Sequence, residues 1–179
     1  MKKVLIVFAT REGQAEKVAR AIAEQLRKPD TEVKIVDAKS DELKSTDLAQ
    51  FDQIVCGGSL HAGGTEKELV EFIQKNQSKI QSSENAFFLV LLSAATKDKG
   101  LREEMLRDAR KKLSQQLPFE FNHLEMIAGA LLYSKYSWPL KWVMRKIAKK
   151  AGEDTDTTRD YEYTDWKQVK DFANRLLAN

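Results

Sequence analysis

The sequence predicts an α/β fold in three layers, in which helices cover both faces of a parallel sheet of five strands in the order 2-1-3-4-5. Apolar, β-branched runs alternate with amphipathic helical patterns along the chain, which is typical of repeated β–α units. The first, third and fourth runs are apolar and the second is half polar, so the second strand is predicted at an edge. The 179 residues, 42% hydrophobic and 32% charged, are predicted to form a single domain, 1–179.

The first half of the chain contains three predicted strands and two helices. Strands are predicted at residues 4–9, 31–37 and 53–56, helices at 13–26 and 65–76, and at most a short helix within 39–50. Thr65 is the predicted N-cap residue of its helix, and Glu68 could complete a capping box.

The second half continues the alternation. Residues 86–93 form the most hydrophobic run and are predicted to be a central strand, followed by a charged helix over 99–116. A fifth strand is predicted over 124–132, with an interruption at Gly129. The final helix begins near Asp165, which could cap it, as could Thr164.

Composition excludes several classes of protein. The formal net charge of +3 gives no argument for nucleic acid, and two scattered histidines with one cysteine make no metal site. Cys56 is either a small buried hydrophobe or a reactive thiol. No secretion signal or membrane-spanning stretch is found, which predicts a cytoplasmic protein and leaves open a peripheral contact with the inner face of the cell membrane.

A ligand is expected where the order of the strands reverses, between the first and third strands. Two loops are predicted to meet there, at residues 10–15 and 57–64, and the loop at residues 93–100 is predicted to be adjacent. No GxGxxG follows the first strand and no GxxxxGK[ST] occurs anywhere, so dinucleotide and P-loop sites are not predicted.

The first of these loops opens a helix, so free backbone N–H groups and the positive end of the helix dipole favour an anion. Gly13 permits a sharp turn, Thr10 offers a hydroxyl, and Arg11 adds a cation if it turns inward rather than to solvent. Glu12 would repel a phosphate unless its carboxylate points away. From the loop alone, a phosphate site and a plain strand-to-helix turn both stay open.

The second loop has four glycines in eight positions, which would let a flat ligand approach the backbone. His61 is its only titratable side chain, and is either an exposed loop residue or a donor near a reducible ring. The third loop combines small residues and hydroxyls that suit a ring packed against backbone.

Three motifs carry a resemblance to a known family: FATREGQAEKVA, GGSLHAGG and AGALLYSKYSWPLKWVMRKIAKKAGEDTDTTRDYEYTDW. In this order and spacing they resemble the flavodoxin-like, menaquinone-dependent protoporphyrinogen IX dehydrogenases of bacterial haem synthesis. The match runs from Val4 nearly to the end of the chain. The first two motifs are shared loosely by flavodoxin-like proteins, whereas the third is far more specific.

The resemblance implies a flavodoxin-like fold and noncovalent FMN, with the redox chemistry carried by the flavin and by no catalytic side chain. The implied phosphate-binding residues are Thr10, Arg11, Glu12, Gly13, Gln14 and Ala15. The residues implied to flank the isoalloxazine are Ser59, Leu60, His61, Ala62, Gly63, Ser93, Ala94 and Ala95. Flavodoxins favour Thr-x-Thr-Gly-x-Thr. An acid such as Glu12 is typical of the haem-synthesis family, whereas Ala15 removes a hydroxyl and predicts weaker FMN binding.

Residues 133–163 are a predicted basic, Tyr/Trp-rich insertion after or within the fifth strand, and no acidic residue lies between Met126 and Gly152. A helix over 138–151 would carry cations and Trp142 on one face. Its predicted apolar face consists of Leu140, Val143, Met144, Ile147, Ala148 and Ala151. The candidates for contact with substrate or membrane are Tyr133, Tyr136, Trp138, Lys141, Trp142, Arg145 and Lys149.

Three roles for this helix stay open: packing on its own domain, contact with an anionic membrane, and attraction of the propionates of the substrate. The acidic residues 153–156 could instead pair with its lysines and hold the helix down.

The resemblance implies oxidation of protoporphyrinogen IX to protoporphyrin IX, with electrons passed to menaquinone or another quinone. One alternative is a flavodoxin-like FMN electron carrier or quinone reductase, although a sequence pI of about 8.8 argues against the acidic carriers. A second alternative is an interaction domain that no longer binds flavin.

Overall fold

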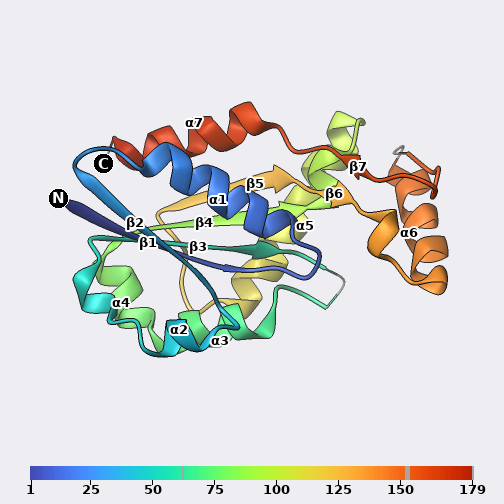
Figure 1. Cartoon of the computed structure of the whole chain (residues 1–179). Helices are drawn as coiled ribbons and strands as arrows, with labels where there is room; N and C mark the ends of the chain where they lie inside the picture. The colour runs from blue at the N-terminus through green and yellow to red at the C-terminus, as the bar shows by residue number, and fades with distance from the viewer. Residues whose placement is uncertain (62, 152–153, 179) are drawn as a thin grey trace.

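A parallel sheet forms the centre of the computed structural model, which describes residues 1–61, 63–151 and 154–178 (Figure 1). Its five strands are β1 (Lys2–Ala9), β2 (Thr31–Asp37), β3 (Gln53–Ser59), β4 (Glu84–Leu91) and β5 (His123–Ala128). Their order is β2-β1-β3-β4-β5, and every neighbouring pair is parallel. The predicted α/β fold and strand order are therefore confirmed.

Helices cover both faces of this sheet, as Figure 1 shows. One face carries α1 (Gln14–Leu26) and α7 (Trp166–Leu177), which also contact each other. Elements on the other side are α2 (Asp41–Lys44), the 3-10 turn η1 (Leu48–Gln50), α3 (Lys67–Lys75), α4 (Gln77–Ser82), the 3-10 turn η2 (Leu92–Ala95) and α5 (Lys99–Gln116). The three predicted layers are thus present.

The apolar runs of the sequence are explained by burial on both faces. In β1, Val4, Ile6 and Phe8 belong to the core under α1 and α7. The alternate residues Leu5, Val7 and Ala9 belong to the core under α3 and α5. In β2, by contrast, Val36 alone is fully buried, which confirms an edge strand.

The start of α3 differs from the prediction. The helix begins at Lys67, and Thr65 does not cap it: Glu66 holds the N-cap position without a side-chain cap hydrogen bond. Thr65 is instead buried, and its backbone N–H donates to Gln116 Oε1 at 3.1 Å. The predicted capping box is therefore wrong, because α5 supplies the partner for Thr65. At the other end of the chain, Asp165 caps α7 by accepting from two backbone N–H groups.

The fifth predicted strand is broken at Gly129. β5 ends at Ala128, and β6 (Ala130–Leu131) pairs antiparallel with β7 (Tyr161–Glu162) in a separate sheet. Between them lie the 3-10 turn η3 (Tyr133–Lys135) and α6 (Trp138–Ala151), the latter with the predicted bounds. We refer to residues 130–163 as the insertion.

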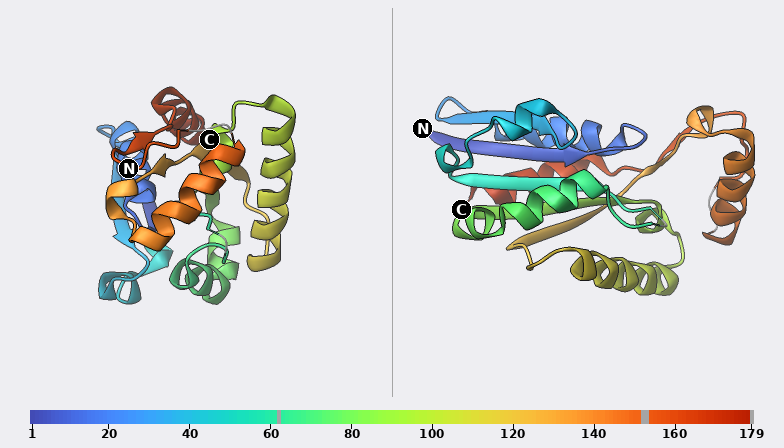
Figure 2. Two further views of the ribbon diagram at one scale, coloured as in Figure 1. Left: turned by 90° about the vertical axis from the view of Figure 1, so that its right-hand side faces the viewer. Right: turned by 90° about the horizontal axis from the view of Figure 1, so that it is seen from below.

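The insertion stands beyond the carboxyl ends of the strands, at the end of the molecule opposite the chain termini (Figure 2). It has its own hydrophobic cluster, which consists of Leu131, Tyr133, Tyr136 and Ala148. Met144 packs against this cluster, but Val143 is exposed, so its predicted inward position is wrong. The side chains of Leu140, Ile147 and Ala151 lie outside the described residues. Within the described part of the chain, no helix is long and apolar enough to cross a membrane.

The packing around Gly57 gives a stability prediction. A Cβ at this position in β3 would lie 2.0 Å from Phe88 Cε1, inside a core ring of β4. Gly57→Ala is therefore expected to lower the free energy of unfolding by about 1–3 kcal/mol, measured by urea denaturation. Gly100→Ala is the matched control, since a Cβ there meets only ordinary contact distances on α5. An equal effect of the two substitutions would contradict this packing.

Candidate functional site

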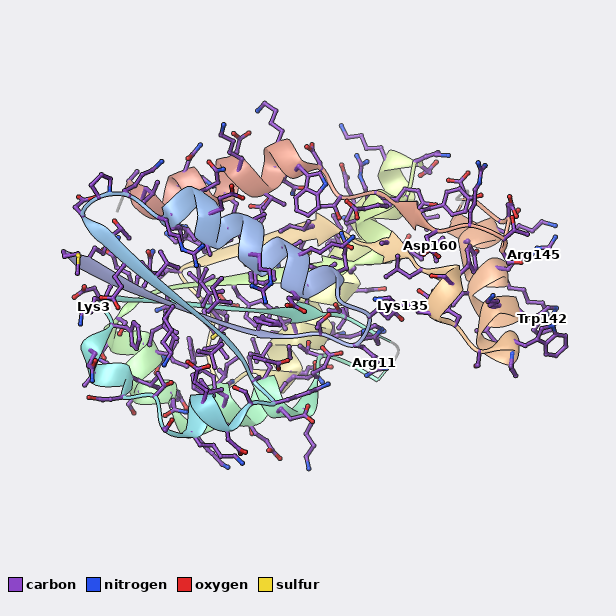
Figure 3. The ribbon with its side chains drawn as sticks, in the orientation of Figure 1. Lys3, Arg11, Lys135, Trp142, Arg145 and Asp160 are labelled. Atoms are coloured by element: carbon purple, nitrogen blue, oxygen red, sulfur yellow. The ribbon has the colours of Figure 1, made fainter. Side chains whose placement is uncertain are left out.

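Three loops meet at the carboxyl ends of β1, β3 and β4, as the sequence predicts. Because β3 lies between β1 and β4, the segments that follow these strands are neighbours. Leu60, just after β3, donates its N–H to the carbonyl of Val90 in β4 at 2.8 Å, which ties the start of the second loop to the end of β4. Figure 3 shows Arg11 and Lys135 at this end of the sheet, between the domain and the insertion.

The loop between β1 and α1 is shaped by Gly13, which has φ +99°. This left-handed conformation favours glycine. The Gly13 N–H donates to Thr10 Oγ1 at 2.8 Å, so the Thr10 hydroxyl proton is free to donate elsewhere. The N-cap position makes no side-chain hydrogen bond to the first turn of α1. The first N–H groups of the helix therefore offer donors to an anion, beside a hydroxyl.

The Glu12 carboxylate, which could have opposed an anion here, is engaged by the insertion. Tyr136 donates its hydroxyl to Glu12 Oε2 at 3.2 Å. The same hydroxyl oxygen accepts a hydrogen bond from the Leu132 N–H at 3.4 Å, so two hydrogen bonds fix the position of the Tyr136 hydroxyl. Burial, followed by the nearby Glu12 charge, raises the pKa of Tyr136, which keeps the phenol protonated and donating.

Two lysines border the same loop. Lys135 donates its ammonium group to the Glu12 carbonyl. Lys39, which follows β2, donates to the Thr10 carbonyl at 3.4 Å. Both lysines were absent from the predicted site, because their positions in the sequence lie far from residues 10–15.

Gln14 and Ala15 present only backbone to this loop. The Gln14 side chain is buried and donates to Thr164 Oγ1 at 2.9 Å, which ties α1 to the segment before α7. Ala15 is fully buried in the core under α1. Position 15 therefore serves core packing and offers an anion only its backbone N–H.

A buried carboxylate connects the first two loops. Glu66, at the start of α3, is 4% exposed and has no hydrogen-bond partner for either carboxylate oxygen among the described residues. Its Oε1 lies 3.4 Å from His61 Nε2 and 3.7 Å from Arg11 Nε. His61 is therefore not a freely exposed loop residue, and Arg11 is attracted toward the second loop while remaining largely exposed. Glu66 was absent from the predicted site, because its contacts are with residues of two other loops.

The glycines of the second loop serve two purposes. Gly57 and Gly58 lie within β3, where a Cβ would meet Phe88 or the side chains of α3, so they allow close packing and not ligand approach. Gly64 has φ +99° and closes a tight turn through mutual backbone bonds with His61. A Cβ at Gly63 would meet nothing within 4 Å, so this backbone is the open part of the loop.

The remaining predicted residues of the second and third loops are small or partly buried. Ser59 is the buried last residue of β3, and Leu60 packs against the core under α3. Ser93, Ala94 and Ala95 lie in η2 with intermediate exposure, directly after β4. The predicted residue Ala62 lies outside the described residues.

The structure divides the predicted residues of the insertion into two groups. Tyr133 and Tyr136 are buried in the cluster of the insertion and are not exposed for contact with a membrane. Trp138 is 81% exposed and Trp142 is 55% exposed. Lys141 has intermediate exposure, and Arg145 and Lys149 are exposed.

The described residues of the acidic segment 153–156 do not form ion pairs with the described cations of α6. Asp154 accepts from the Tyr163 hydroxyl at 3.0 Å, and Asp156 pairs with Thr158 and Arg159. Lys146 stands over Trp142, with Nζ 3.6 Å from the ring centroid. The helix α6 thus presents an exposed face in which tryptophans and cations are mixed.

Comparison with known proteins defines the class. A family model described as a flavodoxin domain matches residues 5–158, and the chain therefore belongs to the flavodoxin domain family. Oxidised flavodoxin 1 from Bacillus cereus superposes with a TM-score of 0.54 at 17% identity, over 99% of both chains. A WrbA-like flavodoxin from Agrobacterium tumefaciens gives a TM-score of 0.52. At such identities, these structures support the fold alone.

Relatives that match nearly all of this chain carry a more specific name. The chain is 29% identical to protoporphyrinogen IX dehydrogenase (quinone) of Escherichia coli strain K12, over 97% of this chain and 94% of that protein. A protein of the same name from Leishmania major is 28% identical over 98% of this chain and 75% of its own. The predicted resemblance is thus confirmed, and it extends through the insertion.

The contact between His61 and Glu66 gives a second prediction. Among the described residues, His61→Leu would leave the buried Glu66 carboxylate with Arg11 as its one cationic neighbour. This substitution is expected to destabilise the protein by about 1–3 kcal/mol. In His61→Leu/Glu66→Gln the unpaired charge is gone, so part of this loss should be recovered. Urea denaturation of His61→Leu, of Glu66→Gln and of the double variant measures the coupling free energy between the two side chains. Strictly additive effects would show that the two side chains do not interact.

Proposed function

We propose that this chain is an FMN-dependent oxidoreductase that converts protoporphyrinogen IX to protoporphyrin IX in haem synthesis and delivers the electrons to a quinone. The full-length similarity to two dehydrogenases of that name supports this proposal most strongly, because it includes the insertion and not only the flavodoxin core. Bound FMN would supply two-electron chemistry between substrate and quinone, so no side chain has to act as a nucleophile.

The residues at the three loops fit a flavin mononucleotide. The uncapped N–H groups of α1 and the Thr10 hydroxyl fit its phosphate, and Glu12 is drawn aside by Tyr136. The open backbone near Gly63 and the small residues of η2 fit a flat ring. We assign the binding of the phosphate to Thr10 and to the backbone of Gly13, Gln14 and Ala15. We assign the binding of the ring to segments 59–63 and 93–95.

The insertion is suited to a large anionic substrate. It stands beyond the same ends of the strands as the three loops and contacts the first loop directly. Its exposed cations, Arg145 and Lys149, are groups that bind carboxylates such as propionates. The flavodoxin core alone would equally suit an electron carrier or quinone reductase, which remains the second candidate.

Turnover tests the proposal directly. Under anaerobic conditions, FMN-loaded protein should produce fluorescent protoporphyrin from protoporphyrinogen IX when a menaquinone analogue is present. The apoprotein is the control, and should show only the background rate. No porphyrin formation by loaded protein, together with reduction of its flavin by a nicotinamide nucleotide or a reductase, would instead favour the second candidate.

We also propose that α6 lies on the anionic inner face of the cell membrane, where a quinone would be dissolved. Exposed Trp138 and Trp142 on one face, among Lys146 and Lys149, form the pattern of an interfacial helix. Trp138→Ala/Trp142→Ala should weaken binding to anionic vesicles at least about tenfold, since two large apolar side chains no longer enter the interface.

Cosedimentation with vesicles of mixed neutral and anionic lipid measures this effect. Trp166→Ala is the matched control, because Trp166 is 41% exposed but belongs to α7. Equal binding of the double variant and the unmodified protein, or no binding by either, would contradict a membrane role for α6.

A further inference from the structure

Lys135 is placed against the loop between β1 and α1 although it belongs to the insertion. It ends η3, and its side chain reaches from the insertion back toward this loop, as Figure 3 shows. Its ammonium group donates to the Glu12 carbonyl and lies 3.4 Å from the position that a Cβ at Gly13 would occupy. The cation is therefore next to the residue that opens α1.

The contact with the Glu12 carbonyl neither neutralises the charge of Lys135 nor occupies all of its donors. An ammonium group has three donors, and the Glu12 carbonyl takes one of them. Among the residues that the structure describes, Lys135 has no carboxylate within 4 Å. The acid whose pKa it helps to lower, Asp160, is held mainly by the hydroxyl and N–H of Ser134. Lys135 thus keeps free donors and charge for an anion at the loop.

The neighbouring residue removes a competitor for that anion. Tyr136 donates to the Glu12 carboxylate and is itself fixed by the Leu132 N–H. Successive residues of the insertion therefore do two complementary things at one loop: Lys135 adds a positive charge, and Tyr136 withdraws a negative one.

We propose that Lys135 binds the FMN phosphate, with Tyr136 as a positioning residue for Glu12, so that the insertion completes the cofactor site. This inference rests on the FMN binding that the proposed function requires. It explains how a phosphate loop with a single hydroxyl and an acid holds its ligand. The insertion then acts on the cofactor as well as on the substrate.

Comparing FMN with riboflavin isolates the phosphate, since riboflavin lacks it. Dissociation constants are measured by quenching of flavin fluorescence for the unmodified protein, for Lys135→Ala and for Lys112→Ala. Lys112 is exposed on α5, so its variant matches the change in net charge. Lys135→Ala should weaken FMN binding about tenfold at low salt, less at high salt, and leave riboflavin binding unchanged. Lys112→Ala should change neither.

Two results would overturn the role of Lys135. One is FMN binding by Lys135→Ala within twofold of the unmodified protein. The other is an equal loss of FMN and riboflavin binding, which would mean a structural effect. Unmodified protein that binds neither flavin would contradict both this inference and the proposed function. Protein that binds FMN through Lys135 but forms no porphyrin would contradict the proposed function alone.

The positioning role of Tyr136 has its own test. Tyr136→Phe should weaken FMN binding and not riboflavin binding, because the released Glu12 carboxylate would repel the phosphate. Tyr136→Phe/Glu12→Gln should restore FMN binding, since the repulsive charge is gone. Failure of the second substitution to restore binding, or an unchanged affinity in Tyr136→Phe, would overturn this role. Thermal unfolding of each variant reports folding separately.

Discussion

Burial of β1, β3 and β4 on both faces is the constraint on which the rest of the structure depends. Side chains of β1 alternate between the core under α1 and α7 and the core under α3 and α5. Each large apolar side chain buried in this way contributes about 1.5–3 kcal/mol. The register and order of the central strands are therefore strongly fixed, and the three loops at their carboxyl ends are brought together as a consequence.

The insertion is attached to this core in a different way. Its hydrophobic cluster consists of its own residues, with Leu92 of η2 packed against it, and its contacts with α1 and the preceding loop are mainly polar. Lys135 and Tyr136 reach Glu12, and Lys17 of α1 pairs with Glu162. Polar contacts at partly exposed positions are weaker than core packing.

The strand order and most helices could be predicted from the sequence because they depend on periodic burial. The amphipathic pattern over 99–116 predicted the observed bounds of α5. Pro139, in the first turn, helped to predict those of α6. The short helix α4 was missed, since Ile80 is its only buried residue and it carries no periodicity. Gly57 and Gly58 were interpreted as ligand contacts because their close packing depends on residues distant in sequence.

For the site, the sequence located the loops but not their supporting residues. Glu66, Lys135 and Lys39 act through contacts between distant segments, and nothing in their local sequence marks them. Glu12 is a further example: its residue type suggested repulsion of an anion, and only the structure shows that its carboxylate accepts a hydrogen bond from Tyr136.

The crystal structure of the protein with FMN tests the central claim, that these three loops form one flavin site, most directly. The phosphate should lie on the first N–H groups of α1, within hydrogen-bond reach of the Thr10 hydroxyl and the Lys135 ammonium group. The ring should lie between segments 59–63 and 93–95. A flavin bound elsewhere, or a phosphate away from the start of α1, would contradict the account.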